Sequence, residues 1–268
     1  MIVHNFDPVI VDFGLFQIRW YSIAYILGII LGWVYGIKII KSLSNKHNFV
    51  NISQRHFDDL IIYLIFGIIL GGRLGYVIFY NFGYYKNNFF EIFQIWQGGM
   101  SFHGGLIGVI LVTIFFSQNR KINFFNLTDI ISCVAPIGLF LGRIANFING
   151  ELFGKTSTLP WAVIFPDGGN IARHPSQIYE AFLEGIILFI LINFLALKKN
   201  LLLKSGYVSA LFLILYSILR IISENFREPD QHIGYLFSYV SMGTLLSCVT
   251  FLAGSLMIFF IKKNEQNN

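Results

Sequence analysis

The sequence predicts an all-α integral membrane protein with seven transmembrane helices, and three observations lead to this fold class. Apolar residues make up 55% of the 268 positions, and the mean hydropathy is +0.66. Charged residues make up only 12%, about half of the roughly 25% found in soluble domains. The apolar residues form runs of about 20, the length that crosses a bilayer as a helix. The sequence therefore predicts a single helix bundle over residues 1–268 and excludes a soluble domain or a long disordered region.

The seven apolar runs are too long, and alternate too little with polar residues, to be transmembrane strands. We therefore expect helices, with ends defined to within a few residues. In chain order the predicted spans cover residues 20–40, 60–80, 98–116, 127–148, 176–197, 207–226 and 236–261. No basic residue precedes Arg19, so the first span lacks the charged start of a cleaved signal peptide and is expected to be retained.

The loops predict the orientation, because Lys and Arg concentrate in cytoplasmic loops. One alternate set of loops and ends holds eleven basic residues: Lys38, Lys41, Lys46, Arg55, Arg120, Lys121, Lys198, Lys199, Lys204, Lys262 and Lys263. The opposite set holds five: Arg19, Lys86, Lys155, Arg173 and Arg227. We therefore expect a periplasmic N-terminus and a cytoplasmic C-terminus. The same distribution argues against nucleic acid as the partner of the positive charge.

Two of the predicted outer segments are long. Residues 81–97 include four aromatics, spaced to lie on one side of a short helix: Phe89, Phe90, Phe93 and Trp96. This spacing predicts an interfacial arm lying on the outer leaflet. Residues 149–175 carry glycine, proline and charge. This composition predicts a small folded periplasmic cap.

Three of the nineteen basic residues, Arg73, Arg143 and Arg220, lie inside predicted spans. An ionised side chain at mid-bilayer costs about 2.5–3.5 kcal/mol on insertion scales, so it normally faces a partner or a wet cavity. Guanidinium groups that converge in such a place are suited to a phosphodiester, because each planar fork contacts two phosphate oxygens. A phospholipid headgroup is the phosphate most available at that depth. Carboxylates within or near the spans are Asp129, Glu151, Glu180, Glu184 and Glu224.

The sixth span carries Tyr216, Arg220 and Glu224 at spacings of four residues, so the three side chains share one helix face. One interpretation is an Arg–Glu pair that only makes the helix insertable. The other is an anion site in which Glu224 orients Arg220, with Tyr216 nearby.

The fourth span ends in four polar residues. Arg143 and Asn146 are three residues apart and share a face, and Asn149 and Glu151 follow at the end of the run. Charged side chains near helix ends often only reach for the interface. Four polar groups exceed that need, so a functional role is the better interpretation.

Two further residues are candidates with weaker support. His103 lies among glycines near the predicted outer end of the third span, where it is a base, a hydrogen-bond donor or a satisfied core histidine. Tyr25 precedes a row of glycines in the first span, from which its ring can reach the bundle interior.

Four stretches carry a resemblance to a known family: residues 101–108, 142–154, 173–180 and 216–224. On these the chain resembles the prolipoprotein diacylglyceryl transferases, with the long match over 142–154 the most specific. Two small departures are Phe153, where tryptophan is expected, and Ala145, where glycine is frequent.

The resemblance implies a reaction in a bacterial inner membrane. The diacylglyceryl group of phosphatidylglycerol passes to the lipobox cysteine thiol of a preprolipoprotein, giving a thioether and glycerol 1-phosphate. Arg143 and Arg220 would hold the phosphate, and Glu224 would orient Arg220. Neither a metal nor another cofactor is expected, and the enzyme is expected to act as a monomer.

The resemblance also implies roles for the remaining candidates. Asn146 and Glu151 would shape the headgroup pocket, Gly154 would keep the outer loop close to it, and Tyr25 would position lipid. The general base is His103 or, alternatively, Tyr216.

Two other functions remain possible from the residues. Buried arginines also line the routes of transporters and channels for anionic lipids or solutes, although the repeated broken spans typical of transporters are not found. A metal-dependent lipid phosphotransferase usually has clustered aspartates, whereas Asp129 is the only aspartate within a predicted span.

Overall fold

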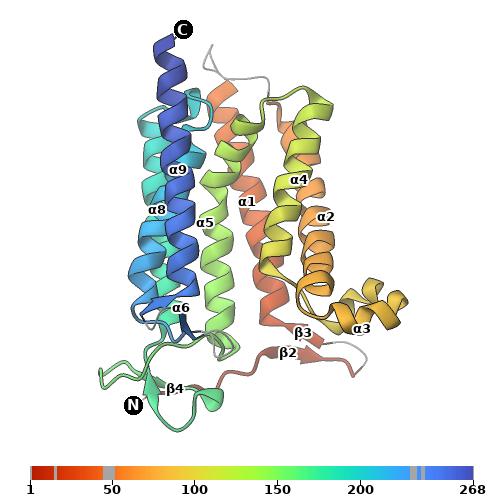
Figure 1. The fold of residues 1–268 in the computed structure, drawn as a ribbon, viewed down its shortest axis with the longest axis vertical. Helices are drawn as coiled ribbons and strands as arrows, with labels where there is room; N and C mark the ends of the chain where they lie inside the picture. Colours follow the sequence, from red (N-terminus) through yellow and green to blue (C-terminus); the bar gives the residue numbers. More distant parts are fainter. Residues whose placement is uncertain (1, 15–16, 45–51, 230–233, 237–238, 268) are drawn as a thin grey trace. The chain divides into compact units, whose positions relative to one another are not determined.

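The computed structural model describes residues 2–14, 17–44, 52–229, 234–236 and 239–267. Within these ranges seven helices are long and apolar enough to cross a membrane, which confirms the predicted helical membrane protein (Figure 1). Six of the spans contain α1 (Trp20–Ser44), α2 (Gln54–Phe79), α4 (Phe102–Arg120), α5 (Phe124–Ile148), α8 (Tyr207–Glu224) and α9 (Met242–Asn267). The fifth span, in chain order, joins α6 (Ser176–Glu180), the π-helix η4 (Ala181–Ile187), α7 (Leu188–Asn193) and the π-helix η5 (Phe194–Lys198).

The last span begins later than predicted. Strands β6 (Tyr235–Leu236) and β7 (Val240–Ser241) form a short antiparallel pair over the expected helix start, and α9 starts at Met242. Leu236 and Val240, which the sequence places in the span, thus belong to this strand pair before the helix. Lys46, counted in the orientation argument, lies outside the described residues.

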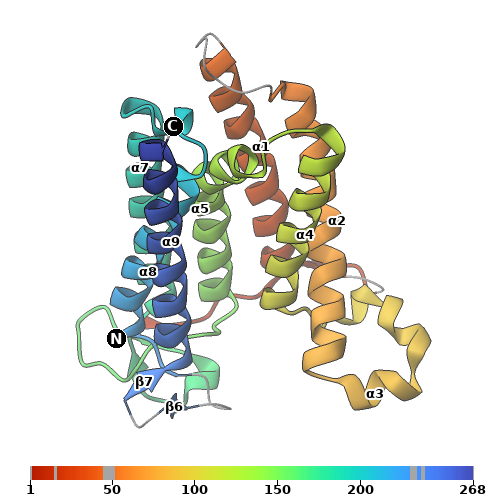
Figure 2. The same cartoon turned by 45° about the horizontal axis from the view of Figure 1, so that its top comes forward.

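The chain forms two compact units. The first comprises residues 1–36 and 129–268, and the second comprises residues 37–128. In the first unit α8 and α9 run side by side, as Figures 1 and 2 both show. In the second unit α2 and α4 form the main helix pair.

Glycines allow the backbones of α2 and α4 to approach closely. A Cβ built on Gly108 would lie 2.0 Å from the carbonyl oxygen of Gly67, and one on Gly104 would lie 2.3 Å from that of Gly71. Without a hydrophobic force between helices in lipid, such close packing supplies much of the association energy. The pair is visible along its length in Figure 2.

We expect Gly108→Ala to destabilise the second unit, because the added methyl group would overlap the backbone of α2. Overpacking of this kind costs about 1–3 kcal/mol or more. Gly105→Ala on the same helix is the matched control, since a Cβ there meets nothing closer than 3.7 Å. Thermal unfolding in detergent should show a lower midpoint for Gly108→Ala alone, and equal midpoints would contradict the packing argument.

The predicted arm is not one short helix. It consists of α3 (Phe82–Asn87) and two 3₁₀ turns, η1 (Phe89–Phe93) and η2 (Ile95–Gln97). The guanidinium of Arg73, a residue only 3% exposed, anchors the part of the arm after α3. It donates to the carbonyls of Glu91 at 2.6 Å and Ile92 at 2.8 Å, and to that of Gly98. With its guanidinium on these carbonyls, Arg73 holds the arm rather than a phosphate.

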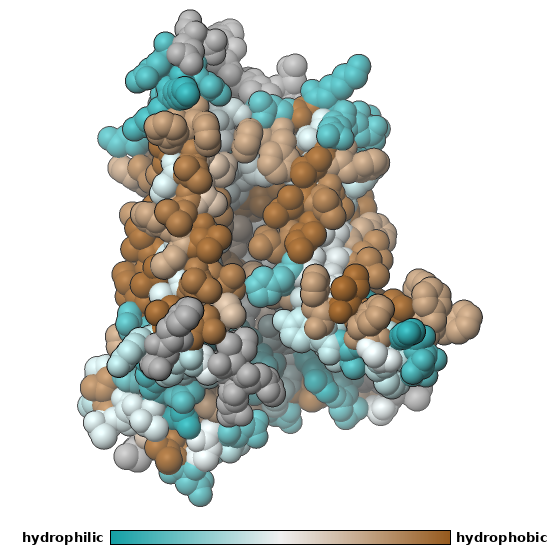
Figure 3. Space-filling model, viewed as in Figure 1, coloured by the Kyte–Doolittle hydropathy of each residue, from teal (hydrophilic) through white to brown (hydrophobic). Residues whose placement is uncertain are grey.

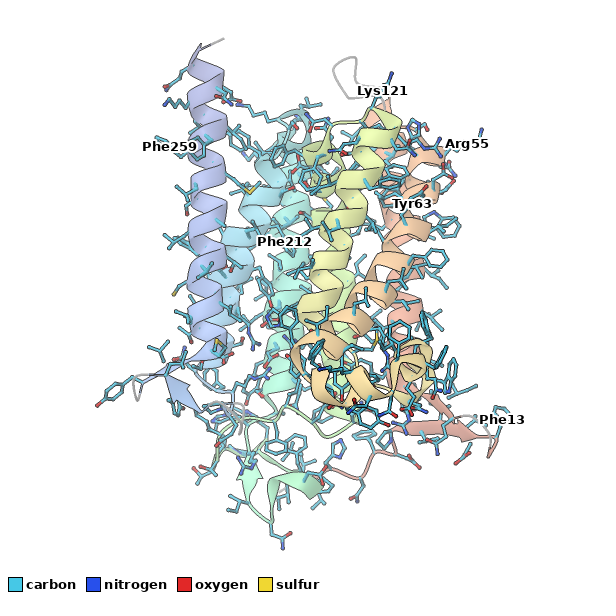
Figure 4. All side chains as sticks on the ribbon, turned by 45° about the vertical axis from the view of Figure 1, so that its right-hand side comes forward. Phe13, Arg55, Tyr63, Lys121, Phe212 and Phe259 are labelled. Atoms are coloured by element: carbon cyan, nitrogen blue, oxygen red, sulfur yellow. The ribbon has the colours of Figure 1, made fainter. Side chains whose placement is uncertain are left out.

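The outward faces of the spans are apolar, and the ends are polar. Figure 3 shows hydrophobic side chains over the middle of α8 and α9, with hydrophilic residues gathered at the helix ends. Phe259 points outward from α9 in Figure 4 and is 60% exposed. In the second unit Arg55 and Lys121 lie at one end of the α2–α4 pair (Figure 4). An exposed ion pair between Arg120 and Asp59, with N–O distance 2.7 Å, lies at that same end.

Short strands occur outside the spans of the first unit. Strand β1 (Ile2–Val3) pairs in parallel with β4 (Val163–Ile164), which pairs antiparallel with β5 (Ala172–Arg173). Strands β2 (Val9–Asp12) and β3 (Gln17–Arg19) form a separate antiparallel pair. The strands therefore connect the start of the chain with the segment predicted as a cap.

Candidate functional site

Two arginines from different helices of the first unit meet at two shared glutamates. Arg143 on α5 places Nη1 2.8 Å from Glu180 Oε2 and Nη2 3.1 Å from Glu184 Oε2. Arg220 on α8 places Nη1 2.9 Å from Glu180 Oε2 and 3.1 Å from Glu184 Oε1. The two guanidinium groups thus converge on one pair of carboxylates.

Arg220 has a third carboxylate partner on its own helix. Its Nη2 lies 2.8 Å from Oε2 of Glu224, four residues later. Glu224 in turn accepts a hydrogen bond from Ser241 Oγ at 2.9 Å. A Cβ on Gly243 would lie 2.5 Å from the Glu224 carboxylate, so the absence of a side chain there leaves room for the acid. Glu224 thus contacts both Arg220 and Ser241, and its orienting role stays a prediction.

The cluster is buried and balanced in formal charge. Glu180 and Glu184 are both 0% exposed, and Arg227 approaches Glu180 Oε1 at 3.6 Å. With Glu224, three carboxylates face the guanidinium groups of Arg143, Arg220 and Arg227. Burying charges is expensive, and only close pairing with good geometry offsets that desolvation.

One donor of the cluster remains available. Among the described residues no hydrogen-bond partner contacts Nε of Arg143, although this atom is buried. A buried donor without a partner loses its hydration with no compensation. An incoming phosphate oxygen would satisfy it, while the terminal nitrogens of Arg143 remain on the glutamates.

Tyr216 lies beside this cluster. It precedes Arg220 by one helix turn on α8, and its phenol interacts electrostatically with both Arg143 and Arg220. Its ring stacks on that of Phe212 at a centroid distance of 6.0 Å.

Asn146 and Glu151 form a second polar group, one turn beyond Arg143. Asn146 Nδ2 donates to Glu151 Oε1 at 2.6 Å and to the hydroxyl of Tyr21 at 3.3 Å. Asn146 is buried, whereas Glu151 is exposed. The amide therefore orients a carboxylate that a ligand can reach.

Gly154 lies where three backbone segments meet. Its N–H donates to the carbonyl of His174 at 2.9 Å, and the residue forms an antiparallel bridge with Arg227. A Cβ on Gly154 would lie 2.4 Å from the carbonyl oxygen of Phe226 and 2.7 Å from Cβ of His174. Glycine is needed here for the close approach of these backbone segments.

Tyr25 and His103 are placed differently from these residues. Tyr25 is 55% exposed on α1, and its ring lies 5.1 Å from that of Tyr21. His103 is exposed near the start of α4, in the second unit, beside Phe102. Their roles therefore stay predictions.

Sequence reasoning named Glu180 and Glu184 only as interior charges and did not assign them to the site. Their spacing of four residues, which puts both on one helix face, was the available signal. It also passed over Tyr21 in favour of Tyr25. No spacing links Tyr21 to Asn146, because the two are 125 residues apart and only the fold joins them.

We expect the stability of the segment around Gly154 to depend on pH through His174. Burial, and then the charge of Lys155, lower the pKa of His174 below its usual 6.5. As pH falls below about 6.5, the unfolded chain takes up a proton on His174 before the folded chain does. The free energy of unfolding is therefore greatest above this pH and declines as the pH falls further. We expect a lower thermal midpoint at about pH 5.5 than at about pH 7.5, with a smaller difference in His174→Gln. Equal differences in both proteins would contradict this assignment.

Comparisons with known proteins agree with one another. Residues 8–260 match the family model described as prolipoprotein diacylglyceryl transferase. The chain is 49% identical over 258 residues to a protein from Rickettsia typhi, covering 96% of this chain and 98% of that protein. It is 48% identical to one from Rhodospirillum rubrum, covering 97% and 93%, and 46% identical to one from Methylocella silvestris, covering 97% and 95%. All three relatives are named phosphatidylglycerol–prolipoprotein diacylglyceryl transferase.

Proposed function

The chain belongs to the prolipoprotein diacylglyceryl transferase family, and we propose that it transfers the diacylglyceryl group of phosphatidylglycerol to a prolipoprotein cysteine. A bond forms between the cysteine sulfur and the glyceryl carbon that carries the phosphate. The bond from that carbon to the phosphate oxygen breaks, and its electron pair leaves with glycerol 1-phosphate. The thiol proton passes to a base.

The convergence of Arg143 and Arg220 on Glu180 and Glu184 supports this proposal most strongly. Negative charge grows on the phosphate as the carbon–oxygen bond breaks, and fixed donors stabilise that charge without reorganising at the moment of reaction. The glutamates hold both guanidinium groups in place beforehand. The buried Nε of Arg143 supplies a donor for the phosphate.

Asn146, Glu151 and Tyr21 are assigned to the glycerol headgroup. A carboxylate and a phenol accept and donate hydrogen bonds to hydroxyl groups, which the headgroup carries. Glu151 is exposed and oriented by Asn146, so its free oxygen is suited to that contact. Tyr25, on the same helix as Tyr21, is assigned to lipid.

A thiol with a pKa near 8.5 reacts only after losing its proton, so the reaction needs a base. His103 and Tyr216 are the candidates. An imidazole is the side-chain group best suited to proton transfer near neutral pH, which favours His103, whereas Tyr216 lies beside the arginine cluster. A pH series of wild type and His103→Gln distinguishes them, because an unchanged profile assigns the role to Tyr216.

The orientation and location follow from the same proposal. The N-terminus and residues 149–175 would face the periplasm of a bacterial inner membrane, and the C-terminus would face the cytoplasm. Lys204 and Glu265, with N–O distance 2.9 Å, would then lie on the cytoplasmic side, in agreement with the distribution of basic residues. The exposed aromatics of 81–97 would rest on the outer leaflet. The chain is proposed to act alone as one functional bundle, without nucleic acid.

The test uses purified protein, phosphatidylglycerol and a synthetic lipobox peptide. Release of glycerol phosphate together with a peptide heavier by the diacylglyceryl group is the expected result. A peptide with serine in place of the cysteine is the control and should give neither product. Movement of lipid across vesicles without glycerol phosphate would favour the transporter alternative, which membership of the family does not favour.

A further inference from the structure

The loop that carries Glu151 has a backbone that requires outside support. Leu152 has φ +57° and follows Gly150 at φ +70°. The left-handed region is unfavourable for a leucine, because its Cβ crowds the backbone. Such residues persist where the surrounding structure holds them, and they gather at functional sites. Leu152 is 39% exposed, so burial of its side chain does not supply that support.

Two adjacent residues at the start of the fifth span hold this backbone. Gln177 Nε2 donates to the carbonyl of Glu151 at 2.6 Å, and Ser176 Oγ donates to the carbonyl of Leu152 at 3.1 Å. Gln177 is 1% exposed and Ser176 is 0% exposed. The hydrogen bonds thus fix the carbonyls on both sides of the strained residue from within the protein.

The Gln177 amide uses its nitrogen but not its oxygen in this arrangement. Within the described part of the chain, its buried Oε1 has no hydrogen-bond partner. A buried amide with an unsatisfied oxygen is unfavourable for stability, so packing alone does not account for glutamine here. The contact that explains a glutamine at this position is the hydrogen bond from its amide to the Glu151 carbonyl.

We propose that Gln177 is a positioning residue for Glu151, acting together with Ser176 to hold the Glu151 carboxylate where Asn146 and the lipid headgroup meet. This inference rests on the proposed function, which assigns Glu151 to phosphatidylglycerol. Glu151 N–H also donates to the carbonyl of Asn146 at 3.2 Å. The backbone of the exposed acid is therefore held from α5 on one side and from Gln177 on the other.

Gln177→Met tests the proposal, because it keeps the length of the side chain and removes the amide donor. We expect kcat/KM for phosphatidylglycerol to fall about tenfold, since small displacements of a binding group lower rates strongly. The KM for the lipobox peptide should stay unchanged. Gln118→Met is the matched control, at an exposed position near the end of α4, and should behave as wild type.

Leu152→Gly separates positioning from a general structural role. Glycine adopts positive φ without strain, so the loop would need less support. We expect Leu152→Gly to restore part of the activity lost in Gln177→Met. In a protein that already carries Glu151→Gln, adding Gln177→Met should lower activity less than about twofold, because the residue that it positions is already changed. The proposal would be overturned if Gln177→Met lowered activity by the same factor in the Leu152→Gly and Glu151→Gln proteins as in wild type. It would also be overturned if Gln177→Met alone kept activity within twofold of wild type.

Ser176→Ala provides a second test if Gln177→Met does not accumulate, because it removes only one hydroxyl group. It should lose activity in the same way, and Leu152→Gly should again restore part of it. Full activity in Ser176→Ala, or no restoration by Leu152→Gly, would overturn the proposal. If wild type itself releases no glycerol phosphate, the proposed function fails instead, so the two failures are distinguishable.

Discussion

Arg143→Lys is expected to lower turnover at least about a hundredfold while the protein still inserts and folds. Lysine keeps the positive charge facing Glu180 and Glu184, so the buried carboxylates retain a counter-ion. It lacks the planar fork and the Nε donor that Arg143 has available. Loss of one donor aimed at developing negative charge typically costs a factor of about 10²–10³ in rate, and an ammonium does not replace a bidentate guanidinium.

The matched control is Arg120→Lys. Arg120 also pairs with a carboxylate, that of Asp59, but its side chain is 43% exposed at a helix end. An exposed pair contributes little to stability, so activity should not change. Turnover of phosphatidylglycerol and thermal unfolding are measured on the same samples. Near-normal turnover of Arg143→Lys would show that the mechanism does not need the planar guanidinium of Arg143.

Gly154→Ala is expected to abolish most of the activity and to lower stability as well. The added methyl group would lie 2.4 Å from the Phe226 carbonyl oxygen and 2.7 Å from His174, so the backbones must separate. Arg227, which pairs with Gly154 and approaches Glu180, would move with them. Shifts of about 1 Å at a site can lower rates about a hundredfold.

Gly83→Ala is the control for this substitution. Gly83 lies in α3, and a Cβ there meets nothing within 4 Å. Both variants are compared by thioether formation and by thermal midpoint in detergent. An active Gly154→Ala protein with an unchanged midpoint would contradict the close packing of the three segments.

The helices could be predicted from sequence because a bilayer imposes a simple length and composition on every span. The ends were less predictable. The arm is broken into short turns that Arg73 holds through their carbonyls, and the last span starts after a strand pair. Both depend on contacts between segments, which hydropathy does not report.

The same limit applies to the site. The face shared by Tyr216, Arg220 and Glu224 follows from helix periodicity, and the Arg220–Glu224 ion pair lies as expected. That Arg143 and Arg220 share the same glutamates does not follow from periodicity, because α5 and α8 meet only in the folded unit. Arg73, the third arginine within the predicted spans, instead donates to backbone carbonyls and lies near the Tyr85 ring.

An experimental structure of the protein with bound phosphatidylglycerol is the most direct test of the phosphate site. We expect phosphate oxygens within about 3.2 Å of Arg143 Nε and of the Arg220 guanidinium, with Glu180 and Glu184 still holding both arginines. A phosphate bound elsewhere, with Arg143 and Arg220 contacting only their glutamates, would contradict this expectation.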